Sequence, residues 1–211
     1  MLIEKETAML HFRPVTESDV PACIAIAEQA FRDDPFFRAV TGGKEKSHHL
    51  LLSLLLRLNL KTQTGFLALE GETPVALALV SPPESAALSV GDCLRNGALR
   101  AIFSCGLPRV FSALSAMGRF NAACDSLPGP KYSLTLLAVA PSHQGRGVGA
   151  SLLRECLFPY LRQKNCSLLC LNTNTRQNCR FYEKNGFTQI AAVTQPIGGI
   201  PVQDWSYKIE L

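Results

Sequence analysis

Several patterns that would place this chain in other classes of protein are absent. The eight cysteines include no Cys-x-x-Cys pair, and His48-His49 has no neighbouring cysteine, so the sequence indicates no metal site. Most cysteines lie among apolar residues, which favours buried, reduced thiols over disulfides. There is no basic run: 21 basic and 17 acidic residues leave a net charge of +4, too dispersed for a nucleic-acid partner.

Long apolar segments are also missing. The N-terminal stretch 1–10 contains two glutamates and lacks the uninterrupted apolar core of a signal peptide. The most apolar stretch, 50–60, is interrupted by Ser53, Arg57 and Asn59 and is too short to span a bilayer. We therefore expect a cytoplasmic protein without a membrane partner. No linker, repeat or low-complexity segment divides the 211 residues, so we expect a single domain over 1–211.

What the sequence does contain is a strand, a glycine-rich loop and a helix in succession. The run 134–139 is apolar and β-prone throughout, as in a strand buried on both faces, and Pro141 ends it. The loop Gln-Gly-Arg-Gly-Val-Gly follows at 144–149, and leucines then recur at helical spacing. Alternating glycines at a helix start let successive N–H groups converge, while the helix dipole and Arg146 add positive charge. The pattern predicts a diphosphate site.

Two familiar phosphate-binding loops fit this segment less well. No Lys-Ser or Lys-Thr follows the last glycine, which excludes the Walker loop. Gly145-x-Gly147-x-x-Ala150 matches the dinucleotide fingerprint, but Asn-Thr-Asn stands at 172–174, where an acidic residue is expected after the next strand. The loop also begins after more than half of the chain. A nicotinamide enzyme is therefore the weakest hypothesis.

A third loop fits better. Gln-Gly-x-Gly-x-Gly after Leu-Ala-Val-Ala-Pro resembles the acetyl-CoA loop of the GNAT superfamily of N-acetyltransferases. The segment 178–187, Asn-Cys-Arg-Phe-Tyr-Glu-Lys-Asn-Gly-Phe, resembles a second motif of that superfamily. Asp-Asp-Pro-Phe-Phe at 33–37, the Pro-Pro after the third strand, the helical segment that follows it and Tyr132 look like the branch that includes puromycin-type acetyltransferases.

The resemblance implies roles for individual residues. Backbone N–H groups of the loop would hold the pyrophosphate of the co-substrate acetyl-CoA, and the strand before it would pair with the pantetheine arm. Tyr182 matches the general acid that protonates the leaving thiolate, with half-buried packing as the alternative. Asn178 matches a CoA-contacting position, with helix capping as the alternative. The implied acetyl-CoA-binding residues are Leu137, Ala138, Val139, Gln144, Gly145, Arg146, Gly147, Val148, Gly149 and Asn178.

The acceptor side of the site is less marked in the sequence. Attack by an amine requires a proton acceptor, but the central strand offers no carboxylate. Glu70 and Asp204 are candidate bases, each also explicable as a turn or edge carboxylate. Asp34, Phe36 and Phe37 stand where relatives shape the acceptor pocket, although an aromatic pair in a loop could equally belong to the core.

The order of elements predicts the fold. We expect strands at 9–14, 65–70, 75–80, 134–139, 167–171, 187–193 and 202–211, and helices at about 16–33, 45–61, 147–163 and 177–185. The segment 31–38 is expected to be a loop. A helical insertion at about 82–130 is expected as two helices, 91–105 and 107–121. One crossover helix implies a parallel central pair, so the fold class is α/β, a GNAT-like mixed, mostly antiparallel sheet of six to seven strands flanked by helices.

The insertion and the second helix leave alternatives open. The insertion's Arg95, Arg100, Arg109 and Arg119 are most simply a solvated face, with a specific anion site as the alternative. Its mostly apolar character favours a small-molecule amine over a peptide as acceptor. The apolar helix 45–61 is either core or a dimer face, so both monomer and homodimer stay open.

The combined hypothesis is an acetyl-CoA-dependent N-acetyltransferase in which the amine of a small molecule attacks the thioester directly. Cys170 and Cys179 are poor acyl carriers because no histidine lies in either motif to activate them. The alternative is a non-catalytic acyl-CoA-binding or sensing module on the same fold. Tyr182 favours catalysis, whereas the missing central-strand carboxylate favours sensing.

Overall fold

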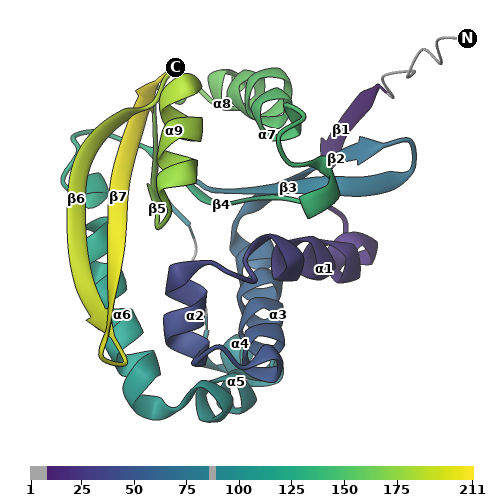
Figure 1. The fold of residues 1–211 in the computed structure, drawn as a ribbon. Helices are drawn as coiled ribbons and strands as arrows, with labels where there is room; N and C mark the ends of the chain where they lie inside the picture. Colours follow the sequence, from purple (N-terminus) through teal and green to yellow (C-terminus); the bar gives the residue numbers. More distant parts are fainter. Residues whose placement is uncertain (1–8, 86–88) are drawn as a thin grey trace, which may run out of the picture.

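A computed structural model describes residues 9–85 and 89–211. Outside the described residues lie 1–8, which belong to the stretch examined above for a signal peptide, and 86–88 of the predicted insertion. The described residues form a seven-stranded sheet of order β1-β2-β3-β4-β5-β7-β6 (Figure 1). The β4–β5 pair is parallel and the other neighbours are antiparallel, which confirms the predicted mixed sheet. The strands are β1 Leu10–Pro14, β2 Thr64–Glu70, β3 Thr73–Ser81, β4 Tyr132–Val139, β5 Leu168–Thr173, β6 Thr188–Ile197 and β7 Ile200–Glu210.

Helices cover both faces of this sheet (Figure 1). Strand β3 is buried on both sides: Ala76, Ala78 and Val80 pack in the cluster that contains α7 and α8, whereas Leu77 and Leu79 pack with α1 and α3. This alternation is the period-2 geometry of a strand between two helical layers. The helices outside the insertion are α1 Val20–Ala30 after the 3₁₀ turn Glu17–Asp19, α2 Pro35–Thr41, α3 Glu45–Thr62, α7 Val148–Ser151, α8 Phe158–Gln163 and α9 Arg176–Lys184.

The predicted loop at 31–38 is wrong from Pro35 onward, where α2 begins. The Oδ1 atom of Asp34 accepts hydrogen bonds from the backbone N–H groups of Phe36 at 2.9 Å and Phe37 at 3.1 Å, so Asp34 is the N-cap. A proline at the first helical position loses no hydrogen bond, and its φ already suits the helix. The pair Asp-Pro therefore starts a helix here, although proline is read more readily as a breaker.

The predicted helix at 147–163 is also not continuous. A π-helical segment, Leu152–Leu157, separates α7 from α8, and at its end the N–H of the C-cap residue Phe158 bonds to the carbonyl of Leu153. Pro159 follows and has no N–H to donate to the preceding turn, which a wider π turn accommodates. The three segments still pack as one rod, with Leu152, Leu157 and Leu161 fully buried.

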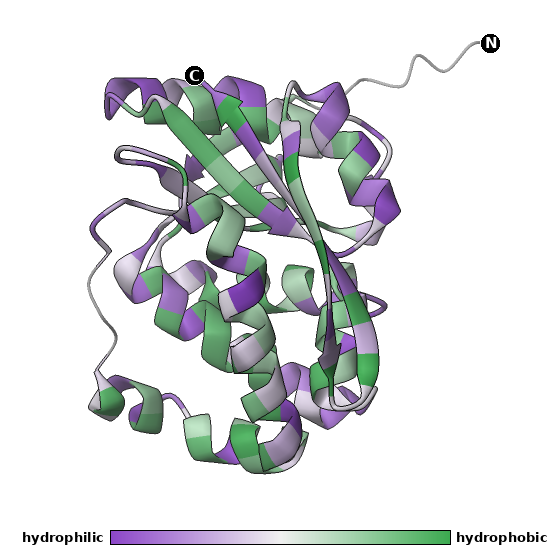
Figure 2. Ribbon diagram, turned by 90° about the vertical axis from the view of Figure 1, so that its left-hand side faces the viewer, coloured by the Kyte–Doolittle hydropathy of each residue, from purple (hydrophilic) through white to green (hydrophobic). Residues whose placement is uncertain are grey.

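The helical insertion between β3 and β4 contains three described helices instead of the two predicted: α4 Val90–Arg95, α5 Ala98–Cys105 and α6 Leu107–Asp125. The additional break falls at Gly97, whose φ of +89° ends α4 in a left-handed conformation. Within the described residues no single helix has the length and hydropathy of a membrane span; α5 and α6 pass that test together, bent by 102°. Figure 2 shows apolar residues along these helices at the lower edge of the molecule.

Candidate active site

Strands β4 and β5 diverge in the middle of the sheet. Their parallel pairing comprises two register pairs, Tyr132 with Leu169 and Ser133 with Cys170, after which both strands continue separately. A bulge at Thr135, between the pairs that join β4 to Leu79 and Val80 of β3, adds to the bend of β4. We call the gap that opens between the two diverging strands the wedge. Beyond Ser133, alternate residues of β4 direct their N–H and C=O groups away from β3 and into the wedge. The predicted pantetheine-binding residues lie on that edge.

The glycine loop begins where β4 ends. A 3₁₀ turn, Pro141–His143, leads into it, and Gly145 and Gly147 have φ values of +74° and +85°. A Cβ atom at either glycine would meet no heavy atom within 4 Å, so both face open space. This open cradle at the start of α7 fits an anionic group such as a pyrophosphate.

The third glycine serves a different purpose. A Cβ atom at Gly149 would lie 3.3 Å from Cζ of Phe181 and 3.4 Å from Cγ2 of Val139. Gly149 therefore lets the start of the rod pack closely against both α9 and β4. The same contact links the two sequence motifs, because Phe181 belongs to the second one.

Side chains hold the loop in place. The Nε2 atom of Gln144 donates to the carbonyl of Val139 at 2.9 Å. Glu70, at the end of β2, bonds through one oxygen to Nε2 of His143 at 3.1 Å and through the other to Arg146 at 3.0 Å. The hydrogen bond from His143 and the charge of Arg146 lower the pKa of Glu70. Glu70 thus anchors the loop and makes a poor proton acceptor, and the role of His143 was missed in the sequence.

Tyr182 lies on the inner face of α9, which stands beside β5 (Figure 1). Its ring is buried and packs 5.4 Å from the ring of Phe187 and 6.2 Å from that of Tyr207, measured between centroids. No hydrogen bond joins its hydroxyl group to another of the residues that the structure describes. Burial raises the pKa of Tyr182 well above its usual range, so the phenol holds its proton at neutral pH.

Asn178 occupies the first turn of α9, and Thr175 is the N-cap. The Oγ1 atom of Thr175 accepts a hydrogen bond from the backbone N–H of Asn178 at 3.2 Å. The capping alternative for Asn178 is therefore wrong, and its half-buried side chain forms no hydrogen bond with any described residue. Thr175 could have been found in the sequence, because a threonine three residues before a polar helix position is a common capping pattern.

Asp204 lies on β7, the strand that pairs with β5. It is 2% exposed; Oδ1 accepts a hydrogen bond from Nδ2 of Asn174 at 3.2 Å, and Oδ2 is buried without a partner among the described residues. Burial raises the pKa of Asp204 to about 7, and the charge of Asp34 adds to the shift. Burial also raises the pKa of Asp34. The carboxyl groups of Asp204 on β7 and Asp34 at the start of α2 are thus close enough for the charge of Asp34 to raise the pKa of Asp204.

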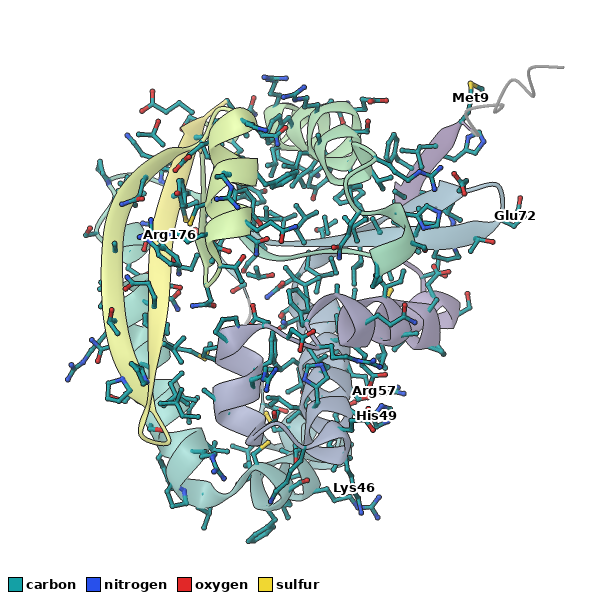
Figure 3. All side chains as sticks on the ribbon, viewed as in Figure 1. Met9, Lys46, His49, Arg57, Glu72 and Arg176 are labelled. Atoms are coloured by element: carbon teal, nitrogen blue, oxygen red, sulfur yellow. The ribbon has the colours of Figure 1, made fainter. Side chains whose placement is uncertain are left out.

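The aromatic pair after Asp34 is part of the hydrophobic packing. The rings of Phe36 and Phe37 meet edge to face at 5.5 Å between centroids, and Phe37 also contacts Phe31 at 5.2 Å. Both side chains are half-buried against core clusters on opposite sides of α2. Arg176, the first residue of α9, stacks over the ring of Trp205 on β7 at 4.6 Å from the ring centroid. Figure 3 shows Arg176 lying along β7.

The metal-ligating and thiol groups of the described residues form neither a metal cluster nor a disulfide. Within residues 9–85 and 89–211, no cluster of three His, Cys, Asp or Glu side chains could hold a metal ion. All eight cysteines are free thiols, and six of them are buried, which confirms the predicted burial of most of them.

Comparisons with known proteins agree with this geometry. The model of the acetyltransferase (GNAT) domain matches residues 114–189, a range that includes β4, the glycine loop, β5 and α9. No curated protein matches the chain. The narrower resemblance to the puromycin-acetyltransferase branch stays a prediction.

Solved structures share the whole fold. A polyamine N-acetyltransferase of Drosophila melanogaster has a TM-score of 0.66 at 16% identity, with 96% of this chain and 100% of that one covered. A structure from Corynebacterium glutamicum, described as a histone acetyltransferase and related acetyltransferase, has a TM-score of 0.62 at 20% identity over 93% and 94% of the two chains. At these identities the likeness establishes the fold. The family match identifies residues 114–189, with the wedge, the glycine loop and α9, as GNAT acetyltransferase domain sequence, and the solved structures show that the chain has the fold of such acetyltransferases.

Proposed function

We propose that residues 1–211, acting as one domain, transfer the acetyl group of acetyl-CoA to the amine of a small molecule by direct attack. The observation that carries the proposal is the wedge between β4 and β5, with the open glycine cradle at the end of β4 and, on β7, the buried carboxylate of Asp204, one oxygen of which has no partner among the described residues. The eight free thiols are consistent with work in the reducing cytoplasm.

The chain's own groups fit acetyl-CoA as co-substrate. N–H groups around Gly145 and Gly147 would bind the pyrophosphate, with Gln144, Arg146, Val148 and Gly149 shaping the cradle and Asn178 close by. The open edge of β4 from Leu137 to Val139 would pair with the pantetheine arm. A backbone N–H there can also bond to the thioester carbonyl as it gains negative charge, an interaction that is worth roughly 3 kcal/mol in comparable enzymes.

Tyr182 is the proposed general acid. When the amine nitrogen forms its bond to the carbonyl carbon and the carbon–sulfur bond breaks, the departing thiolate needs a proton. A phenol with a raised pKa keeps that proton until it is needed, and the hydroxyl of Tyr182 is not committed to another described residue.

Asp204 is the proposed general base. An acceptor amine is mostly protonated at neutral pH and must lose a proton to attack. A carboxylate with a pKa of about 7 and one free oxygen is suited to remove it, directly or through a water molecule. Asp204 thereby supplies, from β7, the carboxylate that the central strand lacks, which weakens the alternative of a non-catalytic sensing module.

The acceptor is proposed to be a small, cationic amine. No ion pair joins Asp34 or Asp204 to a lysine, arginine or histidine among the described residues, so neither carboxyl group is already neutralised by a cation of the chain. Phe36 and Phe37 brace the helix that carries Asp34. The similar Drosophila enzyme is described as forming N-acetylagmatine, and a structure of an agmatine N-acetyltransferase is similar over 96% of this chain, with a TM-score of 0.64.

The test measures thiol release from acetyl-CoA with each of four kinds of acceptor: agmatine, an aliphatic diamine, an arylalkylamine and short peptides. The mass of the product is measured in parallel. The proposal expects stoichiometric release of thiol and an acetylated product with one of the small cationic amines. Binding of acetyl-CoA without turnover on any amine would favour the sensing module, and transfer to peptides alone would overturn the acceptor class.

A further inference from the structure

The solvent side of the helical insertion is unusually apolar. Helices α4, α5 and α6 expose large hydrophobic side chains, including Phe103 at 71% and Phe111 at 67% exposure. Leu99 and Phe103 are four residues apart on α5, and α6 repeats this spacing, so each helix carries a stripe. An extended apolar patch of this kind is uncommon on a protein without a partner. We call it the insertion face, defined by Leu94, Leu99, Phe103, Leu107, Phe111 and Leu114.

An arginine-lined hollow adjoins this face. Arg57 of α3, Arg95 of α4 and Arg100 of α5 line a hollow of about 300 Å³, and no acidic residue among those that the structure describes lines it. Asp92, on the same helix as Arg95, is already paired with Lys61 at 2.7 Å. Three guanidinium groups around an open hollow form a site for a phosphate-type anion.

The hollow and the apolar face belong to the same short helices. Arg95 follows Leu94 on α4 and Arg100 follows Leu99 on α5, and all four side chains are exposed, so each of these helices presents an arginine and an apolar side chain on neighbouring sides. In Figure 1, α5 lies at the bottom of the molecule and the rod α7–α8 at the top, and Figure 3 shows Arg57 beside α3, below α1, on the side of the sheet away from that rod. The arginines are therefore not part of the acetyl-CoA site.

We propose that the insertion face binds an anionic lipid surface, with its apolar side chains entering the headgroup boundary and Arg57, Arg95 and Arg100 contacting lipid phosphates. Interfacial helices combine these two features: Phe and Leu on one side, and arginine on the other. Helices α5 and α6 together have the hydropathy of a membrane segment, but their 102° bend suits a surface contact better than a span. The lack of a single membrane-spanning helix among the described residues does not bear on a surface contact of this kind.

Two other occupants explain less. In a two-fold dimer through this face the same patch meets itself, which would bring the arginine-lined hollows of two copies toward one another. A free phosphate ion would fill the hollow but leave Phe103 and Phe111 exposed to water. An anionic lipid surface satisfies both the charged and the apolar groups.

The test is co-sedimentation of the full chain with vesicles of phosphatidylcholine alone and with about 30% phosphatidylserine, at low and high salt. We expect binding to the anionic vesicles that weakens with salt. Because each arginine near such a surface strengthens binding roughly fivefold, the double variant Arg57→Gln/Arg100→Gln should bind at least about tenfold more weakly. The double variant Phe103→Glu/Phe111→Glu should abolish binding.

Matched controls are Arg162→Gln on α8 and Met9→Glu, an exposed cation and an exposed apolar residue at the other end of the molecule. Both should bind like the wild type, and all variants should keep the wild-type melting temperature because the substituted side chains are at the surface. Equal binding by the wild type and Phe103→Glu/Phe111→Glu overturns the proposal. A second result would also overturn it. That result is a wild-type protein that does not bind vesicles and is a dimer by light scattering, together with a monomeric Phe103→Glu/Phe111→Glu variant.

Discussion

Asn174 donates a hydrogen bond to Oδ1 of Asp204 at 3.2 Å and leaves Oδ2 of the same carboxylate buried without a partner among the described residues. Most buried polar atoms are hydrogen-bonded, so a half-satisfied carboxylate is a costly arrangement that requires an explanation. A proton-accepting role provides one, because a fully bonded carboxylate would have a lower pKa and no free oxygen.

Replacing Asp204 with asparagine should reduce acetyl transfer. The side chain keeps its shape but cannot accept the amine proton, so we expect kcat/KM to fall about 10²- to 10⁴-fold. In the wild type, kcat/KM should rise as the pH passes through about 7, where Asp204 loses its proton. Initial rates from pH 5.5 to 9 (a range of about 3.5 units around that pKa) would show this limb in the wild type and not in the variant. An unchanged profile in Asp204→Asn would assign the limb to another group.

The same substitution should change how stability depends on pH. The pKa of Asp204 is about 7 in the folded protein and 3.8 in the unfolded reference, so between these values the folded state binds the extra proton. The free energy of unfolding therefore falls as the pH rises from about 4 to about 7, by an amount on the order of 4 kcal/mol for this group.

Asp204→Asn removes that loss, so relative to the wild type it should be more stable at pH 8 than at pH 4. Chemical denaturation at the two pH values measures the difference. The control Asp33→Asn, at an exposed carboxylate, should shift neither value. Equal pH dependence in Asp204→Asn and the wild type would show that Asp204 ionises normally.

The glycine cradle can be tested with a matched pair of substitutions. Gly147 and Gly199 both have φ near +85°, and at both a Cβ atom would meet nothing within 4 Å. Alanine at either position should cost about 1–2 kcal/mol of backbone strain. Only Gly147→Ala places a methyl group in the proposed pyrophosphate site, so only that variant should raise KM for acetyl-CoA, by roughly tenfold for 1.4 kcal/mol of lost binding. A similar increase in Gly199→Ala would indicate a general loss of structure.

Direct attack predicts a particular kinetic pattern. Both substrates must be bound together, so double-reciprocal plots at several acceptor concentrations should intersect. Parallel lines, the ping-pong pattern, would require a covalent acyl-enzyme. Cys170 is the thiol to test in that case, because it lies next to the wedge, where its Sγ contacts Oγ of Ser133 at 3.4 Å. Under direct attack, Cys170→Ser should retain turnover.

Much of the fold could be predicted from the sequence because its signals are local. The buried runs of β2, β3 and β4, the glycine loop and the helix 45–61 all depend on short-range periodicity and turn residues. The errors were also local in origin. Pro35 starts a helix because Asp34 caps it, and the π-helical turn before Pro159 compensates for a missing N–H. In both cases one residue admits two conformations, and its neighbours in space determine the choice.

The site was predictable only where motifs mark it. The glycine loop and Tyr182 stand in recognisable patterns, whereas the pairing of Asp204 with Asn174 joins residues thirty positions apart. Glu70 and Asp204 could not be ranked as bases from the sequence. One is anchored by His143 and Arg146 and the other is buried and under-bonded, and this difference arises from packing between distant segments.

The most direct test of the account is thiol release from acetyl-CoA, with the best acceptor amine, by the wild type and Tyr182→Phe. Phenylalanine retains the buried ring, and the hydroxyl forms no bond with a described residue, so the fold should be unaffected. We predict that kcat falls at least about tenfold with little change in KM, whereas the control Tyr160→Phe keeps the wild-type rate. Wild-type turnover by Tyr182→Phe would contradict the proposed acid and leave Tyr182 as a packing residue.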